Sequence, residues 1–285
     1  MADEVRQDPV LGTRVHIVRH RKDRPNLPSA GCPFCIGGLE APDAYEVRHF
    51  PNRWPAMDGD RCEVVLYTPD HDATFWSLGQ HGARKVVDLW AARTAELGAR
   101  DDVDAVLVFE NRGADVGATI SHPHGQIYAF DHVPERQLRR LAWRPDLAAA
   151  NGGERLIVAR DGWAAWVPYA PVFPISIELA PLAHLTDLAA MGDDDRDAFA
   201  ALLVDVLGRL DRMWNRPLPY MLWLNQRPFT KTPDVAGDSA WFNVEIVSPW
   251  RQPGVMRFIA AAEIAGIEYF NEVVPEDLAA RLREL

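Results

Sequence analysis

The feature that most constrains the fold is a repeated order of elements on the two sides of a turn at Asn151-Gly152-Gly153. On each side, a strand is followed by a proline and a histidine, a long helix, a strand that ends in asparagine, and a further extended segment. Corresponding residues are separated by 112, 113 and 114 positions in the pairs Pro69 and Pro181, His71 and His184, and Asn111 and Asn225. Three nearly equal offsets predict a duplicated unit.

Residue periodicity assigns the elements of each unit. Alternating and β-branched stretches predict strands at 63–67, 105–109 and 124–128, and again at 175–179, 220–224 and 241–247. Apolar stripes at helical spacing predict helices over 83–98 and 196–213. One long helix per unit and short connections favour an α+β fold, with an antiparallel sheet flanked by helices. We expect residues 1–150 to form one half and residues 151–285 the other.

Charge and cysteine content exclude several classes of protein. A net charge of -11, from 30 Lys+Arg against 41 Asp+Glu, disfavours a general nucleic-acid binder. No window approaches the roughly 18 apolar residues of a membrane span, and three cysteines make no disulfide framework. The N-terminus MADEVRQDPV lacks a basic start and an apolar stretch, so we expect a cytoplasmic protein. One basic run, from Arg14 to Arg24, is either a solvated charge run or the contact for an anionic small molecule.

The densest polar segment spans residues 109–127. His122 and His124 are separated by one residue in an extended stretch, so they point to the same side, and Gln126 continues that face. A neutral imidazole nitrogen is a competent nucleophile toward phosphorus. Glutamine can donate to a phosphoryl oxygen but cannot act as a general acid, so the pair favours transfer over hydrolysis. The alternative is two surface histidines on a strand.

Residues that can bind phosphate precede the two histidines. Gly113 and Gly117 permit close approach of the backbone, and Asn111 and Thr119 can donate to phosphate oxygens without adding charge.

The pair Cys32 and Cys35 is either half of a zinc site or a redox pair. Its surroundings, with Pro25, Pro28 and Gly31, resemble a loop rather than the junction of a strand and a helix, which favours zinc. Cys62 directly precedes the predicted strand at 63–67, continues its pattern, and is expected to be packed. His71 and His122 are plausible partners, which would complete a Cys2His2 set.

Four motifs together resemble those of the galactose-1-phosphate uridylyltransferase family, a branch of the histidine triad superfamily. They are CPFC at 32–35, TPDH at 68–71, FENRG at 109–113 and HPHGQIY at 122–128. The likeness extends to the arginine segment with Arg21 and Arg24, to a nucleotide-base pocket at 50–54, and to a sugar-contacting stretch at 257–263. It therefore covers most of the chain.

The resemblance implies two fused histidine-triad-like units that form a half-barrel-like antiparallel sheet, with a catalytic first half and a degenerate second half contributing to the sugar site. His124 would be the nucleophile that takes the nucleotidyl group, and Gln126 would hold the phosphate of the covalent intermediate. Members are usually homodimers whose arginine segment reaches the active site of the partner. The implied zinc ligands are Cys32, Cys35, His71 and His122. The implied contacts are Arg21, Arg24, Asn52, Asn111, Gly117, Thr119 and Gln126 for nucleotide and phosphate, and Arg257, Phe258 and Glu263 for sugar.

Several positions depart from the family pattern. Many members hold an iron ion in the second half through several histidines and a glutamate, but the corresponding places carry Asn225, Asn243 and Glu245, so we expect no iron. Ala262 stands where an aromatic residue is usual, and Tyr269 where the family has a sugar-binding glutamine. Nucleotidyl transfer is therefore better supported than a preference for galactose.

The function implied is ping-pong transfer of UMP from UDP-glucose, or from another nucleotide sugar, to galactose 1-phosphate or a related sugar 1-phosphate. Within the same chemistry, an adenylyl-using phosphorylase, or one transferring another nucleoside monophosphate, is the alternative. The non-enzymatic alternative is a zinc-stabilised protein that binds nucleotide sugars without transferring them.

Overall fold

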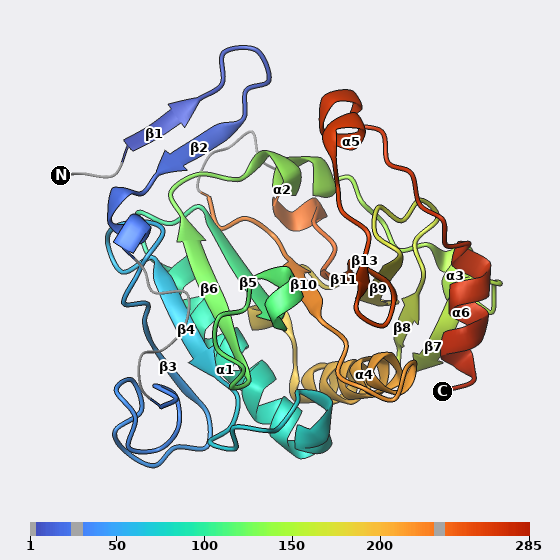
Figure 1. The fold of residues 1–285 in the computed structure, drawn as a ribbon, viewed down its shortest axis with the longest axis horizontal. Helices are drawn as coiled ribbons and strands as arrows, with labels where there is room; N and C mark the ends of the chain where they lie inside the picture. Colours follow the sequence, from blue (N-terminus) through green and yellow to red (C-terminus); the bar gives the residue numbers. More distant parts are fainter. Residues whose placement is uncertain (1–3, 24–30, 231–236) are drawn as a thin grey trace.

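A computed structural model of the chain describes residues 4–23, 31–230 and 237–285. Its centre is an antiparallel sheet of nine strands in the order β3-β4-β6-β5-β10-β11-β9-β8-β7 (Figure 1). This architecture confirms the α+β class. The strands are β3 (Arg48–Pro51), β4 (Cys62–Leu66), β5 (Ala105–Arg112), β6 (His124–Phe130), β7 (Leu156–Arg160), β8 (Trp163–Trp166), β9 (Ile175–Pro181), β10 (Tyr220–Asn225) and β11 (Asn243–Ser248).

The strand order is symmetrical about the β5–β10 pair. On one side of this pair lie β6 and then β4, and on the other side lie β11 and then β9. The pairing repeats as well: β5 pairs antiparallel with β6, the next strand of the first unit along the chain, and β10 pairs antiparallel with β11 in the second. A duplicated unit predicts this arrangement. The division between residues 150 and 151 stays a prediction.

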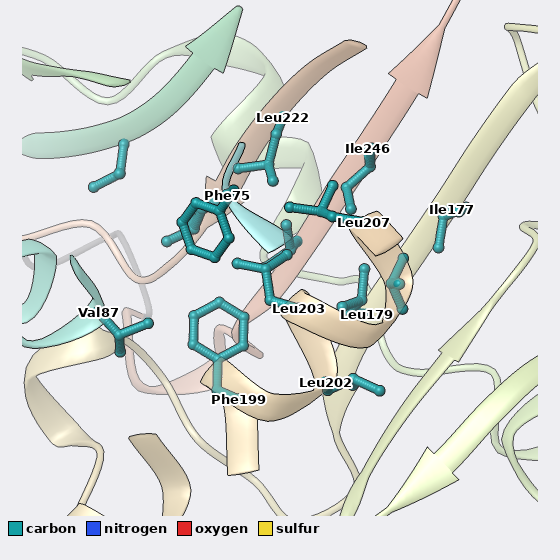
Figure 2. Close-up of a cluster of buried hydrophobic side chains, with 14 of the residues drawn as sticks. Phe75, Val87, Ile177, Leu179, Phe199, Leu202, Leu203, Leu207, Leu222 and Ile246 are labelled. Carbon is teal, nitrogen blue, oxygen red and sulfur yellow. The ribbon is translucent and has the colours of Figure 1, made fainter. Parts of the chain in front are cut away.

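Two long helices cover one face of the sheet. They are α1 (Gly79–Gly98) and α4 (Asp193–Arg212), which begin four and three residues before the predicted helices and pack against each other. Figure 2 shows Phe199, Leu203 and Leu207 of α4 among the buried side chains of β9, β10 and β11. The core therefore lies between this helical layer and one face of the sheet.

The opposite face of the sheet carries the polar side chains. Along β6, residues 125, 127 and 129 are buried toward the helices, whereas His124, Gln126 and Tyr128 alternate with them and are half-buried. Period-2 alternation thus places His124 and Gln126 on the face away from α1 and α4. Cys62 is buried in β4, as expected for a packed cysteine.

Shorter elements surround the sheet, and sequence periodicity predicted none of them. In Figure 1, the β1–β2 hairpin and α5 project separately at the top of the molecule. Within the described residues, no helix combines the length and apolar character needed to span a bilayer. These elements are β1 (Glu4–Gln7), β2 (Arg14–Ile17), η1 (Arg19–Asp23), η2 (Trp76–Leu78), η3 (Ala114–Val116), α2 (Glu135–Arg140), α3 (Leu147–Ala150), η4 (Leu188–Ala190), η5 (Gly237–Ser239), β12 (Trp250–Gln252), β13 (Val255–Met256), α5 (Ala261–Gly266) and α6 (Pro275–Arg283).

Candidate active site

A cavity of about 670 Å³ opens beside the start of β6. Its walls come from the cysteine-containing loop at 31–40, from the segment between β3 and β4, and from residues 119–120 just before β6. Apolar and aromatic walls beside a few polar groups are typical of a site for a small organic molecule. The lining includes Phe34, Glu40, Phe50, Asn52, Arg53, Trp54, Val64, Thr119, Ile120, His124 and Gln126.

His124 is the first residue of β6, and one hydrogen bond fixes its tautomer. Its Nδ1 donates to the carbonyl oxygen of His122 over 2.7 Å, so Nδ1 carries the proton and Nε2 carries the lone pair. Phe34 packs against the His124 ring with centroids 5.0 Å apart, and against the His122 ring at 6.0 Å. Both rings therefore contact Phe34, but His124 lines the cavity whereas His122 is fully buried. In the neutral ring, Nε2 is therefore the nitrogen with the lone pair that a nucleophile requires.

Gln126 lies two residues farther along the same face of β6, and Asn52 orients its amide. The backbone N–H of Trp54 donates to Asn52 Oδ1 over 2.9 Å, and Asn52 Nδ2 donates to Gln126 Oε1 over 3.3 Å. Because Oε1 accepts this bond, the Nε2 hydrogens are the side of the amide that can bind an anionic oxygen.

The loop between β5 and β6 begins with a tight turn around η3. Gly113 has φ 93° and Gly117 has φ 85°, a region that L side chains rarely adopt. The N–H groups of Val116 and Ala118 donate to the carbonyl of Gly113, which closes the turn. The turn returns the chain so that Thr119 lines the cavity.

Cys32, Cys35, His71 and His122 converge, as predicted. Their ligand atoms all lie within 4.8 Å of one another. Cys35 Sγ is 3.5 Å from His71 Nδ1, and both sulfur atoms are 3.7 Å from His122 Nδ1. Tetrahedral zinc, with bonds of about 2.3 Å to sulfur and 2.0 Å to nitrogen, would hold S and N about 3.5 Å apart. The four residues form a cluster that could hold a metal ion, and their spacing fits zinc.

Groups around the cluster orient its histidines. The Nε2–H of His122 donates to the carbonyl of Thr68 over 2.8 Å, which leaves Nδ1 facing the thiols. Burial lowers the pKa of His122, so the ring stays neutral, as a metal ligand must. His71 Nε2 lies 3.2 Å from Ser121 Oγ. Tyr45, which sequence analysis missed, bonds the carbonyl of Phe34 over 2.7 Å and lies 3.0 Å from His122 Nε2.

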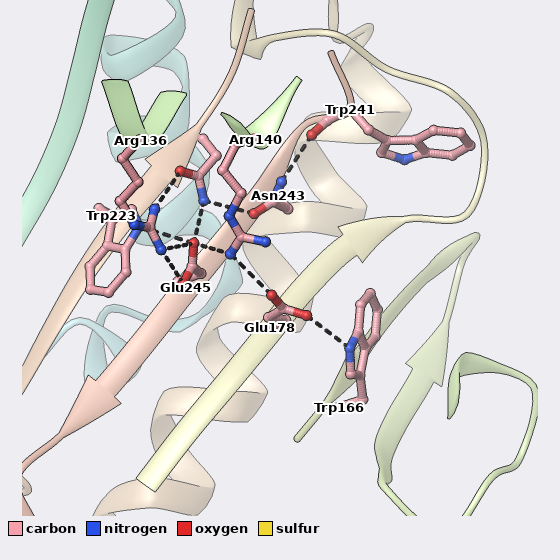
Figure 3. Close-up of polar contacts among 9 residues, drawn as sticks. Arg136, Arg140, Trp166, Glu178, Trp223, Trp241, Asn243 and Glu245 are labelled. Atoms are coloured by element: carbon pink, nitrogen blue, oxygen red, sulfur yellow. Dashed lines mark hydrogen bonds and ion pairs between the residues drawn. The ribbon is translucent and has the colours of Figure 1, made fainter. Parts of the chain in front are cut away.

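Asn225, Asn243 and Glu245, the positions that correspond to the expected iron ligands, do not fit an iron ion. Asn225 Nδ2 lies 2.7 Å from Asn243 Oδ1 and 2.8 Å from Glu245 Oε1, so the three side chains bond one another. Arg136 and Arg140 of α2 both pair with Glu245, as Figure 3 shows. Burial favours the neutral form of Glu245, but the two guanidinium groups outweigh it and lower its pKa. The carboxylate oxygens of Glu245 that a metal ion would need as ligands are thus already paired with two arginine side chains.

The other predicted contact residues are distributed as follows. Asn52, Thr119, His124 and Gln126 line the cavity, and Asn111 lies on β5 beside the start of β6. Arg21 lies in η1 and Arg24 lies outside the described residues. Arg257 and Phe258 precede α5 and Glu263 lies within it, and none of the three lines the cavity.

Arg257 and Glu263 have a structural role of their own. Both are buried and pair over 3.0 Å, and Arg257 also donates to the carbonyls of Phe270 and Val172. Phe258, in contrast, is 68% exposed.

Sequence analysis also missed two contributions to the cavity. Phe34 was part of the quoted CPFC motif, but its packing against His124 was not predicted. Glu40 and Arg53 form an ion pair of 2.8 Å in the cavity wall. Arg53 could have been predicted to line the cavity, because it lies in the 50–54 segment already assigned to the nucleotide-base pocket. Nothing in the sequence around Glu40 indicated that it pairs with Arg53.

Two family models together match most of the chain. Residues 49–134 match the model of the galactose-1-phosphate uridyl transferase N-terminal domain, and residues 116–285 match that of the C-terminal domain.

Two relatives are similar over nearly the whole chain. The galactose-1-phosphate uridylyltransferase of Thermotoga maritima is 32% identical, covering 99% of this chain and 98% of that protein. The enzyme of the same name from Streptomyces lividans is 35% identical, covering 99% and 87%. A solved uridylyltransferase structure superposes with a TM-score of 0.86 at 25% identity, covering 99% of this chain and 98% of the other. The chain therefore belongs to the galactose-1-phosphate uridylyltransferase family, a family of transferases.

Proposed function

We propose that this protein transfers a UMP group from UDP-glucose to galactose 1-phosphate, or to a related sugar 1-phosphate, through a covalent nucleotidyl-histidine at His124. The observation that carries the proposal is the bond from His124 Nδ1 to the carbonyl of His122, which leaves Nε2 as the nucleophilic nitrogen in the wall of the cavity. The names of the relatives support the donor and the acceptor.

The reaction consists of two displacements at phosphorus. Nε2 of His124 attacks the α-phosphorus of UDP-glucose; the Nε2–P bond forms, and the bond from the α-phosphorus to the bridging oxygen breaks. Glucose 1-phosphate leaves with the bonding electron pair. A phosphate oxygen of the second sugar 1-phosphate then attacks the same phosphorus and releases Nε2. Nδ1 keeps its proton throughout, and the His122 carbonyl stabilises the positive charge that develops on the ring.

Gln126 holds the transferred group between the two displacements. With Oε1 bonded to Asn52, the Nε2 hydrogens donate to a non-bridging phosphate oxygen. The amide is neither an acid nor a base near neutral pH, so it does not activate water. Asn111 and Thr119 supply further uncharged donors, and Gly117 permits close approach of the backbone.

The Cys2His2 cluster takes one zinc ion per chain, held by Cys32, Cys35, His71 and His122. Bound zinc would contribute folding free energy by joining the loop at 31–40 to the chain before β6. Thiol ligands favour a reducing compartment, so we propose a cytoplasmic location.

A second copy of this chain completes the sugar end of the site. The stretch around α5 exposes large apolar side chains, with Phe258 at 68%, Ile264 at 70% and Phe270 at 64%. The buried Arg257–Glu263 pair holds this stretch in a fixed shape. Such a surface is suited to contact with another protein. We assign Phe258 and the arginine segment with Arg21 and Arg24 to contacts across a homodimer.

Intact-protein mass spectrometry tests the chemistry. The chain is incubated with UDP-glucose or ADP-glucose without acceptor, and His124→Gly is the control. We expect one uridylyl adduct per chain, about one equivalent of released glucose 1-phosphate, and discharge on adding galactose 1-phosphate. Continuous release of free UMP without acceptor would contradict the transferase. An adduct with ADP-glucose alone would favour the adenylyl alternative, and binding without an adduct would favour the non-catalytic one.

Subunit mixing tests the shared site. His124→Gly lacks the nucleophile and Phe258→Ala lacks the proposed partner contact, so each homodimer should be impaired. Mixed dimers contain one site with both residues intact, and mixing should restore about a quarter to a half of the parental rate. No recovery on mixing, or a monomer by light scattering, would contradict the homodimer.

A further inference from the structure

Tyr67 lies directly beneath the catalytic strand, on the side of the helical layer. Its ring makes edge contacts with Phe75 and Trp90, with centroids 5.4 and 5.7 Å apart, and these two rings stack on each other. Tyr67 is 2% exposed. Three interlocked aromatic rings in the core leave the Tyr67 side chain little freedom to move.

The hydroxyl of Tyr67 presses against the backbone of Gly125. A Cβ atom built at position 125 would lie 2.1 Å from Tyr67 Oη, far inside any allowed contact. The next atoms are Tyr67 Cζ at 3.0 Å and the Phe109 carbonyl oxygen at 3.1 Å. The backbone N–H of Tyr67 also donates to the carbonyl of Pro123 over 3.3 Å. Tyr67 therefore touches the chain on both sides of His124.

A buried carboxyl group lies near the Tyr67 hydroxyl. Glu110 of β5 accepts a hydrogen bond of 2.9 Å from Tyr220, and burial raises the pKa of Glu110 to about 7. The Tyr67 hydroxyl also interacts with this carboxyl group, although among the described residues it has no hydrogen bond of ordinary length. Tyr67 and Tyr220 thus approach the same carboxyl group, but the close contact to Gly125 belongs to Tyr67.

We propose that Tyr67 is a positioning residue for the nucleophile: its hydroxyl fills the space of the side chain that position 125 lacks, and so fixes the backbone from which His124 and Gln126 project. The inference rests on the proposed function, because it assigns a role in the attack by His124. A displacement of about 1 Å at a reacting group can reduce a rate by about 10²-fold. The contact is therefore large enough to affect the chemistry without touching substrate.

A double-mutant cycle with a matched control tests the proposal. The readout is the single-turnover rate of adduct formation with UDP-glucose, together with KM, zinc content and thermal melting. Gly125→Ala should slow adduct formation by about 100-fold while KM changes by less than about twofold. Tyr67→Phe should lower the rate by only about threefold. The double variant Tyr67→Phe/Gly125→Ala should recover at least tenfold over Gly125→Ala, because the atom at 2.1 Å is gone.

Tyr220→Phe is the control, since it removes the other hydroxyl that approaches Glu110. In the Gly125→Ala background it should restore nothing. If Gly125→Ala alone does not fold, recovery means that the double variant Tyr67→Phe/Gly125→Ala folds and forms the adduct. Recovery by both tyrosine changes, recovery by neither, or a parental rate in Gly125→Ala would overturn the positioning role. Parent protein that forms no adduct would instead overturn the proposed function, and this role with it.

Discussion

Replacing Asn52 by aspartate should reverse the orientation of the Gln126 amide. In the native chain, Asn52 Oδ1 accepts from the Trp54 N–H and Nδ2 donates to Gln126 Oε1. Aspartate has nearly the same shape but only accepts hydrogen bonds. One carboxylate oxygen would keep the Trp54 bond, and the other would draw the Nε2 hydrogens of Gln126 toward itself. Gln126 would then present its oxygen, rather than its N–H groups, to the phosphoryl group.

The expected loss follows from the one charge-assisted hydrogen bond that disappears. Hydrogen bonds to charged groups contribute about 1.5–3 kcal/mol, and about 1.36 kcal/mol corresponds to a tenfold change in rate. Adduct formation should therefore slow by about 10- to 150-fold in Asn52→Asp. Asn52→Ala removes the orienting bond without reversing the amide, and an ordinary bond of about 0.5–1.5 kcal/mol gives a loss of about two- to tenfold.

Quenched-flow mixing with UDP-glucose, followed by intact-mass analysis, measures both rates. Circular dichroism and zinc content establish that the variants are folded. Equal rates in Asn52→Asp and Asn52→Ala would refute the reasoning, because they would mean that Asn52 does not set the direction of the Gln126 amide.

Three further predictions concern the nucleophile, the metal cluster and the buried acid. His124→Gly should reduce transfer to less than about a hundredth of the parental rate, a loss above about 2.7 kcal/mol, with zinc content and melting near normal; a higher residual rate would mean another nucleophile. Purified protein should carry one zinc and no stoichiometric iron by elemental analysis, and Cys32→Ser should lower the melting temperature more than it alters the single-turnover rate. Zinc-free protein purified without chelators would contradict this. Because burial raises the pKa of Glu110 from 4.5 to about 7, its protonated form contributes stability that is full below about pH 4.5 and is lost as pH rises through 7. Glu110→Gln should flatten the dependence of melting temperature on pH across this window, and an unchanged profile would show that another group titrates there.

Local patterns predicted much of the site because they depend on few residues. The two-residue period of a strand is sufficient to place His124 and Gln126 on one face. Two cysteines supply only half of a tetrahedral zinc site. Because the recognised motifs contain few other histidines, His71 and His122 could be predicted as the remaining ligands. The long helices were predicted well because their apolar stripes are continuous, although the first turn of each is polar and was missed.

Contacts between distant segments could not be predicted in this way. Arg140 lies in a short helix without an apolar stripe, yet it reaches Glu178 of β9 and Glu245 of β11. Arg257 and Glu263 match a sugar-contacting stretch, but within one chain they bind each other. The Tyr67 hydroxyl against Gly125 depends on the spacing between the sheet and α1. Each of these contacts requires the path of the folded chain, which periodicity does not describe.

The central β5–β10 pair has a consequence for how the chain folds and for whether it can be divided. Its backbone hydrogen bonds join the two units directly, with Met221 opposite Asn111 and Trp223 opposite Phe109. If either half were expressed alone, β5 or β10 would lose its neighbouring strand and become an exposed edge of the sheet. An exposed edge strand is a template for aggregation. The halves should therefore melt in one cooperative transition and fail as separate fragments. The backbone pairing of β5 with β10 in this way makes the two halves a single unit of folding.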